Sequence, residues 1–299
     1  MSCLTHFKIV NENNNEDIRY LTEKDIELLD KNYSTASPFN NNKYGKMKLF
    51  NSLIKYNMGS FYFNFCESLS KYDGAMLFRF LYLSTFMNYK GYLQYGNSSK
   101  QSYNSLIVKK NIQEILKLKD ALYFKTVKYF EENNMIKYDD NNRVYINCKI
   151  CLRGELSNMN KKKDKIRMFD KQIKELYENS KPSEHKNIIL LFKLIPFINK
   201  ETGLVVYNPE ENDIGLLKPM TRKDILEVLN LNNSRTISNL LNLKILKGTE
   251  SAFAKISNAF IKNAYMINPR IAYSGTDINN LELILNEFLP CFKICNKIK

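Results

Sequence analysis

Four of the six cysteines are spaced in the way that metal ligands often are. Cys148 and Cys151 form a CxxC pair, and Cys291 and Cys295 form a CxxxC pair. Together the two pairs could give four thiolates to one zinc ion. The first pair, however, falls in an expected hydrophobic strand, and the second follows an expected helix in an apolar tail. Buried, reduced thiols are therefore the preferred interpretation, and no metal is expected.

Other catalytic patterns are missing from the sequence. It contains no GxxxxGK[ST], GxGxxG or HExxH motif, and its only histidines are His6 and His185. The acidic pairs Glu131–Glu132 and Glu210–Glu211 fall at an expected helix end and in an expected loop, where solvation is their ordinary role. None of the 19 tyrosines is singled out by its neighbours. We expect neither an enzyme nor a cofactor.

The charge of the chain favours a polyanionic partner. Lys and Arg number 45 against 31 Asp and Glu, which gives a net charge of +14 in 299 residues. Nucleic acid is the commonest polyanion, although a lysine-rich surface encoded by an AT-rich genome would have the same composition. No apolar run is long enough to span a membrane, and Met1–Glu16 lacks the apolar core of a signal peptide. We expect a cytoplasmic protein without a membrane partner.

An internal repeat sets the organisation of the chain. Lys110–Phe130 aligns without a gap with Lys223–Leu243, 113 residues further on. The identical pairs are Lys110/Lys223, Ile112/Ile225, Glu114/Glu227, Leu116/Leu229 and Leu118/Leu231. Upstream, each copy has an apolar helix, a polar turn with Gly91 or Gly203, and a short strand. Downstream, each closes on a strand ending in Ile-Asn. We name these the first copy and the second copy.

The order of elements in each copy is that of a winged helix: helix, short strand, helix, tight turn, helix and hairpin. We expect a mainly α fold with small β wings (α+β), formed by two tandem winged-helix domains joined by a basic amphipathic helix. The expected parts are a flexible N-terminal segment (1–45) with a short helix near Glu23–Leu29, the first winged-helix domain (46–156), a linker helix (157–186), the second winged-helix domain (187–275), and a C-terminal helix and tail (276–299).

The last helix before each hairpin would be the recognition helix. In the first copy Asp120 is expected to cap it, and Phe124, Val127 and Phe130 are expected to face the core. Its predicted DNA-binding residues, with Arg143 of the hairpin, are Lys119, Tyr123, Lys125, Thr126, Lys128, Tyr129 and Arg143.

The second recognition helix combines short polar side chains with an arginine and has no carboxylate between Asn232 and Lys247. Asn232 or Asn233 is expected to cap it, and such side chains suit direct readout of base edges. Wing residues Lys255 and Lys262, with Asn258 and Asn263, are expected near phosphates or the minor groove. The predicted DNA-binding residues of this copy are Asn232, Asn233, Ser234, Arg235, Thr236, Ser238, Asn239, Lys255 and Lys262.

The segment between the copies has an apolar stripe at helical spacing opposite many lysines. The stripe residues are Ile166, Phe169, Ile173, Leu176 and Tyr177, and Pro182 is expected to end the helix. We expect this stripe to pack on a domain or on a second subunit. A final helix is expected at about Asp277–Phe288.

The second copy resembles the RepL-type winged-helix replication proteins of plasmids and phages of low-GC Gram-positive bacteria. The similarity lies in PMTRKDILEVLNLNNSRTISNLLNLKIL and in a wing that ends in Ile267-Asn268-Pro269 with Gly275 nearby. The first copy keeps Ile146-Asn147 but has Cys148 in place of Pro. The resemblance implies binding to double-stranded DNA at an origin and recruitment of host replication proteins. It leaves the tandem arrangement unexplained.

Three functions are compatible with these features. The first is a replication initiator that binds origin repeats, and the second is a transcriptional regulator of the same mobile element. The third is a partition or assembly adaptor that binds proteins. The side chains of the recognition helices favour the first two. Another copy of the chain, or host replication proteins, are candidate partners of the linker helix.

Overall fold

The computed structural model describes residues 8–10, 18–20, 61–63, 72–96, 105–148, 150–153, 168–245, 248, 250–257, 263–273 and 284. Contacts divide the chain into two compact bodies, residues 1–57 and 58–299. In the first body, strands β1 (Lys8–Val10) and β2 (Ile18–Tyr20) pair antiparallel, a pairing that the sequence does not predict. The predicted helices near Glu23–Leu29 and Asp277–Phe288 fall outside the described residues, apart from Ile284.

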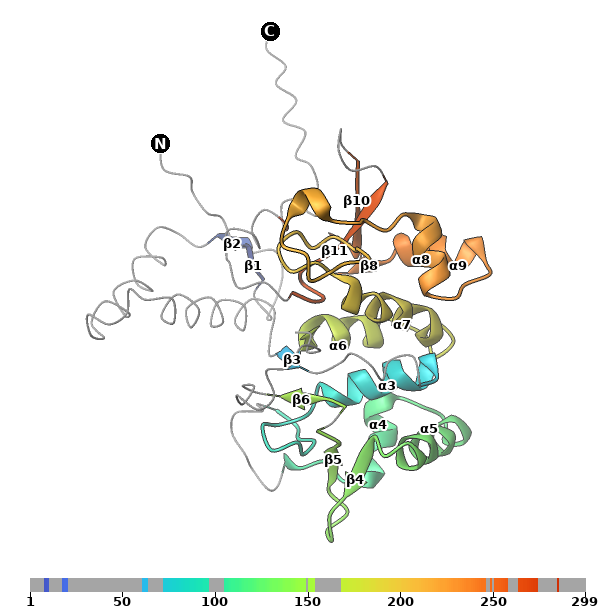
Figure 1. The fold of residues 1–299 in the computed structure, drawn as a ribbon. Helices are drawn as coiled ribbons and strands as arrows, with labels where there is room; N and C mark the ends of the chain where they lie inside the picture. Colours follow the sequence, from blue (N-terminus) through green and yellow to red (C-terminus); the bar gives the residue numbers. More distant parts are fainter. Residues whose placement is uncertain are drawn as a thin grey trace, which may run out of the picture. The chain divides into compact units, whose positions relative to one another are not determined.

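The second body combines helices with small antiparallel sheets (Figure 1). In the first copy, helix α3 (Gly74–Ser84) is followed by a short extended segment that forms single β-bridges, then by two helices and a hairpin. Asp73 caps α3, because its side chain accepts a hydrogen bond from the Met76 N–H. The elements are α3 (Gly74–Ser84), η3 (Lys109–Asn111), α4 (Ile112–Leu116), α5 (Asp120–Glu132), β4 (Ile136–Tyr138) and β5 (Val144–Ile146).

The second copy repeats this order and adds a second strand pair. Strand β8 pairs with β9, and β10 pairs with β11 in the longer hairpin. The elements are α7 (His185–Lys193), η5 (Ile195–Phe197), η6 (Ile214–Leu216), α8 (Arg222–Val228), α9 (Ser234–Leu241), β8 (Lys244–Ile245), β9 (Glu250–Ser251), β10 (Phe253–Ile256) and β11 (Ala264–Ile267).

The backbone hydrogen bonds confirm that the two copies repeat one unit. Leu93 N–H donates to the Val144 carbonyl at 2.8 Å, and Val205 N–H donates to the Tyr265 carbonyl at 2.8 Å. Ile146 N–H donates to the Gly91 carbonyl, as Ile267 N–H does to the Gly203 carbonyl. Both glycines have positive φ, 87° and 70°, which glycine adopts without steric cost. The polar turn, the short strand and the hairpin therefore have the same arrangement in both copies.

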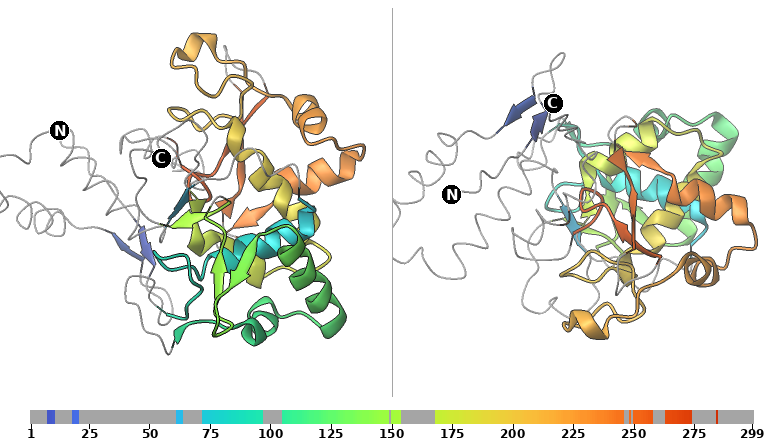
Figure 2. Two further views of the ribbon diagram at one scale, coloured as in Figure 1. Left: turned by 60° about the horizontal axis from the view of Figure 1, so that its bottom comes forward. Right: turned by 90° about the horizontal axis from the view of Figure 1, so that it is seen from above.

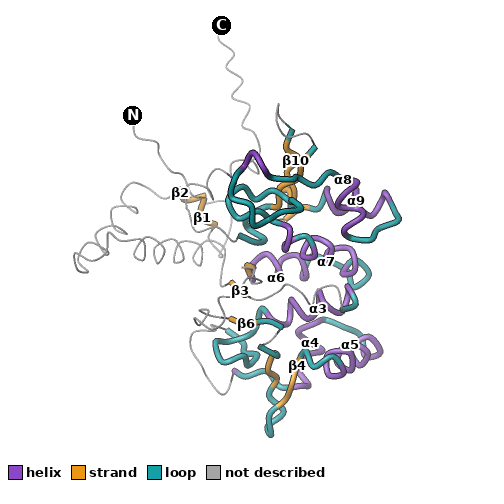
Figure 3. Tube along the Cα trace, in the orientation of Figure 1, coloured by secondary structure: helices purple, strands orange, loops and turns teal. Residues whose placement is uncertain are grey.

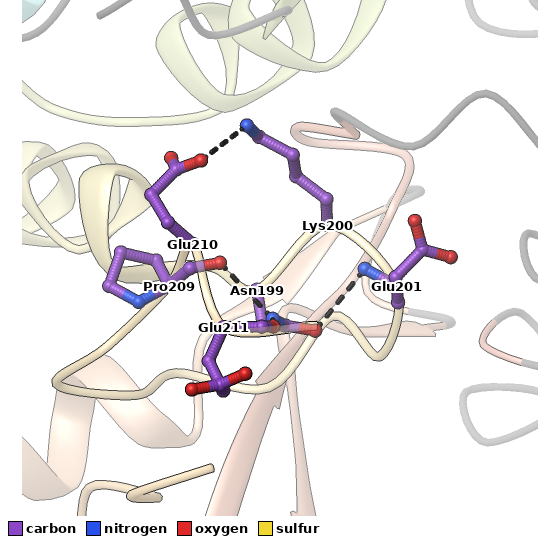
Figure 4. Close-up of polar contacts among 6 residues, drawn as sticks. All are labelled: Asn199, Lys200, Glu201, Pro209, Glu210 and Glu211. Atoms are coloured by element: carbon purple, nitrogen blue, oxygen red, sulfur yellow. Dashed lines mark hydrogen bonds and ion pairs between the residues drawn. The ribbon is translucent and has the colours of Figure 1, made fainter. Parts of the chain in front are cut away.

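A buried asparagine organises the polar turn of each copy. Asn88 Oδ1 accepts hydrogen bonds from two backbone N–H groups, and Asn199 Oδ1 accepts from the N–H groups of Glu201 and Thr202. The Asn199 amide also donates to the carbonyls of Pro209 and Glu211, which ties down the following loop (Figure 4). These bonds satisfy backbone groups that the turn leaves without strand partners.

A small sheet and a helix connect the copies. Strand β3 (Phe61–Phe63) lies between β6 (Leu152–Arg153) and β7 (Met168–Phe169), both antiparallel to it. Strand β3, which precedes the first copy, is thus joined to two strands that follow that copy in the sequence.

The predicted linker helix is shorter in the structure. Helix α6 runs over Asp170–Glu178 and ends before Pro182, while Phe169 of the predicted stripe belongs to β7. Residues 157–167 of the prediction lie outside the described ranges. The remaining stripe is buried: Tyr177 stacks on Tyr82 of α3 at 3.8 Å, with ring planes 2° apart.

Helices α3, α6 and α7 lie between the α4–α5 and α8–α9 pairs (Figure 1), and the left view of Figure 2 shows the same order. Figure 3 shows that the strands are short segments outside this helical layer. Gly74 permits the close approach of α3 and α7, because a Cβ at this position would lie 3.0 Å from Ile189 Cγ2. The buried side chains of both copies form one hydrophobic core.

The gapless alignment of the copies is wrong in one place. Lys117 and Asn230 both adopt the left-handed conformation, with φ of 50° and 51°, and so mark the same point of the helix–turn–helix. Helix α5 begins at Asp120, three residues after Lys117, whereas α9 begins at Ser234, four residues after Asn230. The turn of the second copy is therefore one residue longer, and α5 and α9 correspond at an offset of 114 residues.

Among the residues that the structure describes, no helix has both the length and the apolar composition needed to cross a membrane.

Candidate nucleic-acid interface

The helix–turn–helix of the second copy is held by side-chain caps at both helix starts. Thr221 and Asp224 form a reciprocal capping box at the start of α8. The hydrogen bonds from Thr221 hold the pKa of the Asp224 carboxyl below its usual value. Asn233 caps α9 by accepting a hydrogen bond from the Arg235 N–H at 2.8 Å, as predicted for one of the two asparagines.

The inward face of α9 is apolar. Ile237 and Leu240 are buried, and Leu241 is half-buried. The apolar stripe therefore fixes the rotation of the helix about its axis. Of the predicted DNA-binding residues, Asn232, Asn233, Ser234, Arg235 and Asn239 are exposed, and Thr236 and Ser238 are half-buried.

An arginine that the sequence analysis did not single out organises this polar face. Arg222 Nη2, at the start of α8, contacts the Ser234 carbonyl at 3.0 Å and the hydroxyls of Ser234 and Ser238 at 3.1 and 2.7 Å. Ser238 Oγ in turn donates to the Ser234 carbonyl. Ser234 and Ser238 are thus engaged within the protein, and Arg235 and Asn239 remain as the long exposed donors. The basic residue next to the Thr221 cap was the only signal for Arg222 in the sequence.

The predicted orientation of helix α5 is confirmed for Val127 and Phe130, which are buried, and is wrong for three other residues. Tyr123 and Thr126, predicted to face outward, are buried, and Phe124, predicted to face the core, is 66% exposed. The one-residue difference between the turns is the cause, because it pairs Tyr123 with Ile237 and Thr126 with Leu240. Thr126 Oγ1 accepts a hydrogen bond from Arg79 Nη1 at 3.1 Å, so its polar atom has a partner inside the core.

The other predicted residues of this helix lie at or near the surface. Lys119, Lys125 and Lys128 are exposed, and Tyr129 is half-buried, with its hydroxyl accepting a hydrogen bond from the Asp73 N–H. Lys119, not Asp120, occupies the capping position, and no side chain caps the helix there. Asp120 instead accepts a hydrogen bond from the Gln113 amide at 2.6 Å. Three exposed lysines therefore lie on α5 and at its N-cap position.

The hairpins place fewer predicted residues at the surface. Lys255 of β10 is exposed, whereas Arg143 is half-buried with its guanidinium 3.9 Å from Asp139. Asn263, immediately before β11, is exposed and has a φ of 55°. The predicted residues Asn258 and Lys262 lie outside the described ranges.

The cysteine pair of the first copy does not behave as predicted. Cys148 lies in the turn after β5 and is exposed, so only Cys151 fits the predicted buried thiol. Burial raises the pKa of the Cys151 thiol to about 12, which keeps it protonated. No group of three or more His, Cys, Asp or Glu side chains within the described ranges is placed to hold a metal ion. Cys291 and Cys295 fall outside those ranges.

The two predicted recognition helices therefore present different chemistry. Helix α9 exposes an arginine and an amide beside hydroxyl groups, which can hydrogen-bond to base edges and to phosphates. Helix α5 exposes a phenylalanine and two lysines, with Asp120 and Glu132 exposed at its two ends. Comparison with protein-family models, with curated proteins and with solved structures found no match to this chain.

Proposed function

We propose that the protein binds double-stranded DNA sequence-specifically through two tandem winged helices, with α5 and α9 as recognition helices. The observation that supports this most is the exposed face of α9, which carries Arg235 and Asn239. Asn233 caps this helix, and the side chain of Arg222 holds its serines in place. Arginine and asparagine are the side chains that make bidentate contacts to guanine and adenine.

The surroundings of α9 support an anionic partner. The helix has no acidic residue, and the guanidinium of Arg235 forms no ion pair with any described residue. Helix–turn–helix proteins place the N-terminal residues of the recognition helix against base edges, and Arg235 is the second residue of α9. The net charge of +14 adds attraction to the phosphate backbone.

The role at a replication origin is the more specific part of the proposal. It rests on the resemblance of the second copy to RepL-type replication proteins of Gram-positive plasmids and phages. A transcriptional regulator would use the same contacts, so the location of the binding sites distinguishes the two roles. Sites repeated near an origin support replication initiation, and a single site overlapping a promoter supports regulation.

The experiment that tests DNA binding uses the purified full chain and duplex fragments from around its own gene, with scrambled duplexes as competitors. We expect the protein to bind one fragment in preference to the scrambled competitors. The affinity for that fragment should fall steeply between about 50 and 200 mM salt, because binding releases counterions from the DNA. Equal, weak binding to all fragments would contradict the proposal and favour the adaptor function.

A further inference from the structure

The exposed face of α5 carries a large aromatic side chain. Phe124 is 66% exposed, the highest value among the large hydrophobic residues in the described part of the chain. Ala121, Lys125 and Lys128 are exposed beside it on the same helix. Together, Phe124 and the exposed lysines suit a ligand that offers both an apolar group and negative charge.

The correspondence between the copies shows which face of α5 carries Phe124. With the helix starts superposed, Phe124 takes the position of Ser238, and Ala121 takes the position of Arg235. The buried positions agree with this register, because Tyr123 and Ile237 are both buried, as are Thr126 and Leu240. Phe124 therefore lies on the face that α9 uses for its polar residues, and the core does not account for it.

The Phe124 ring has a firm support. Its centroid lies 5.1 Å from that of Tyr123, and the Tyr123 hydroxyl contacts the Lys109 carbonyl at 3.4 Å. On the inner side of α5, Arg79 holds Thr126. The helix cannot rotate to bury Phe124 without exposing these groups, so the aromatic ring is fixed on the outer face.

Base edges in the major groove offer one apolar group, the C5-methyl of thymine, and phenylalanine is among the side chains that contact it. Exposed Lys119 and Lys125 supply charge complementarity to the phosphates on either side, whereas the ammonium of Lys128 lies 3.7 Å from Glu132 Oε1. We propose that α5 recognises thymine methyl groups through Phe124, so that the first copy reads a thymine-containing half-site while the second reads hydrogen-bonding edges. This inference rests on the proposed DNA-binding function.

The test begins with a duplex selected by the full wild-type chain from a randomised library. Each thymine of that duplex is then replaced singly by uracil, which removes only the methyl group. At one or two positions in one half of the duplex we expect wild-type binding to weaken about fourfold, the factor for one buried methyl group. Phe124→Ala should bind the thymine and uracil duplexes equally at those positions, and Phe124→Leu should keep part of the difference.

Lys125→Ala is the matched control on the same face. It should weaken binding to the thymine and uracil duplexes by the same factor, because a phosphate contact does not sense the methyl group. The midpoint of thermal unfolding should stay within a few degrees for Phe124→Ala, since the side chain is largely in solvent.

The outcomes separate this inference from the proposed function. Wild type and Phe124→Ala could lose the same affinity at every thymine-to-uracil replacement in the selected duplex. That result would overturn thymine recognition by Phe124 and leave DNA binding in place. Failure of the library to yield any preferred duplex would overturn both. Loss of the methyl effect in Phe124→Ala, with retained effects of bases in the other half-site, would support both.

Discussion

Asn88 and Asn199 show how one side chain replaces several missing backbone partners. Each sits buried in the polar turn of its copy, and its Oδ1 accepts two backbone N–H groups. Asn199 also uses its amide group for two carbonyls of the following loop. A buried amide of this kind contributes through the groups that its loss would leave unsatisfied.

Asn199→Ala should therefore lower the free energy of unfolding by about 2–4 kcal/mol, because several partly buried backbone groups lose their partner together. Chemical denaturation monitored by circular dichroism measures this. Lys200→Ala is the neighbouring control: it removes only the exposed ion pair with Glu210, whose effect should be below about 1 kcal/mol. Similar losses in the two variants would refute a special role for Asn199.

Arg235 and Lys255 should differ in what they contribute to DNA binding. Arg235→Ala should cost about 1–3 kcal/mol on the selected duplex and relax its sequence preference, as expected for a base contact. Lys255→Ala, on the exposed face of β10, should weaken binding to all sequences alike. It should also reduce the slope of the logarithm of affinity against the logarithm of salt concentration by about one. Fluorescence titrations at two salt concentrations distinguish these results. Equal and small losses from both substitutions would remove the base-reading role of Arg235.

At the scale of elements, the helix–turn–helix depends on a left-handed residue after its first helix. Lys117 and Asn230 occupy this position with nearly equal φ. Asparagine tolerates the left-handed region, whereas a lysine there crowds its Cβ against the following carbonyl, at a cost of about 1–2 kcal/mol. The first copy therefore contains local strain that the second largely avoids.

Lys117→Gly should raise the free energy of unfolding by about 1 kcal/mol, because glycine adopts a φ of 50° without steric cost. Lys119→Gly is the matched control, since Lys119 has a φ of −71° and gains nothing from glycine. Thermal unfolding should show an increase for Lys117→Gly alone. An equal change in both variants would mean that removal of lysine charge, not relief of strain, is responsible.

The order of elements was predictable from the sequence, and the register of α5 was not. The identical residues up to Leu118 and Leu231 correctly predict that both copies turn after the first helix of the helix–turn–helix. Gly91 and Gly203 mark the polar turns further upstream. Beyond Leu118 no identity fixes the start of the next helix. A shift of one residue rotates a helical face by about 100°, enough to exchange Phe124 with Tyr123. Only the packing of Tyr123 and Thr126 decides between the two registers.

At the scale of the second body, the two copies share one core through α3, α6 and α7. His185 of α7 is buried there, 5.3 Å from the Phe78 ring of α3 and 4.6 Å from the Tyr177 ring of α6. Neither of its ring nitrogens has a hydrogen-bond partner among the described residues. Burial, together with the charge of Arg79, lowers the pKa of His185 to about 4.

The lowered pKa of His185 makes the stability of this body depend on pH. Because the unfolded chain binds the proton at a higher pH than the folded chain, stability is full above about pH 6.5 and is lost towards pH 4. Between pH 7 and pH 5 the loss due to His185 should be on the order of 2 kcal/mol. His185→Phe should reduce this slope in denaturant titrations. Carboxylates titrate in both proteins, so the difference between the two proteins isolates the contribution of His185. An equal dependence of the unfolding free energy on pH in both would contradict the attribution to His185.

The contact between α3 and α7 joins equivalent helices of the two copies, with Gly74 against Ile189. Two separate chains that met through such a surface would fall apart on dilution, and their midpoint of unfolding would move with protein concentration. Covalent linkage instead gives the partner surface a fixed local concentration. The pairing of the copies should thus be as complete in a single molecule as in a concentrated solution. Each copy is also free to change its outer face without having to match an identical partner.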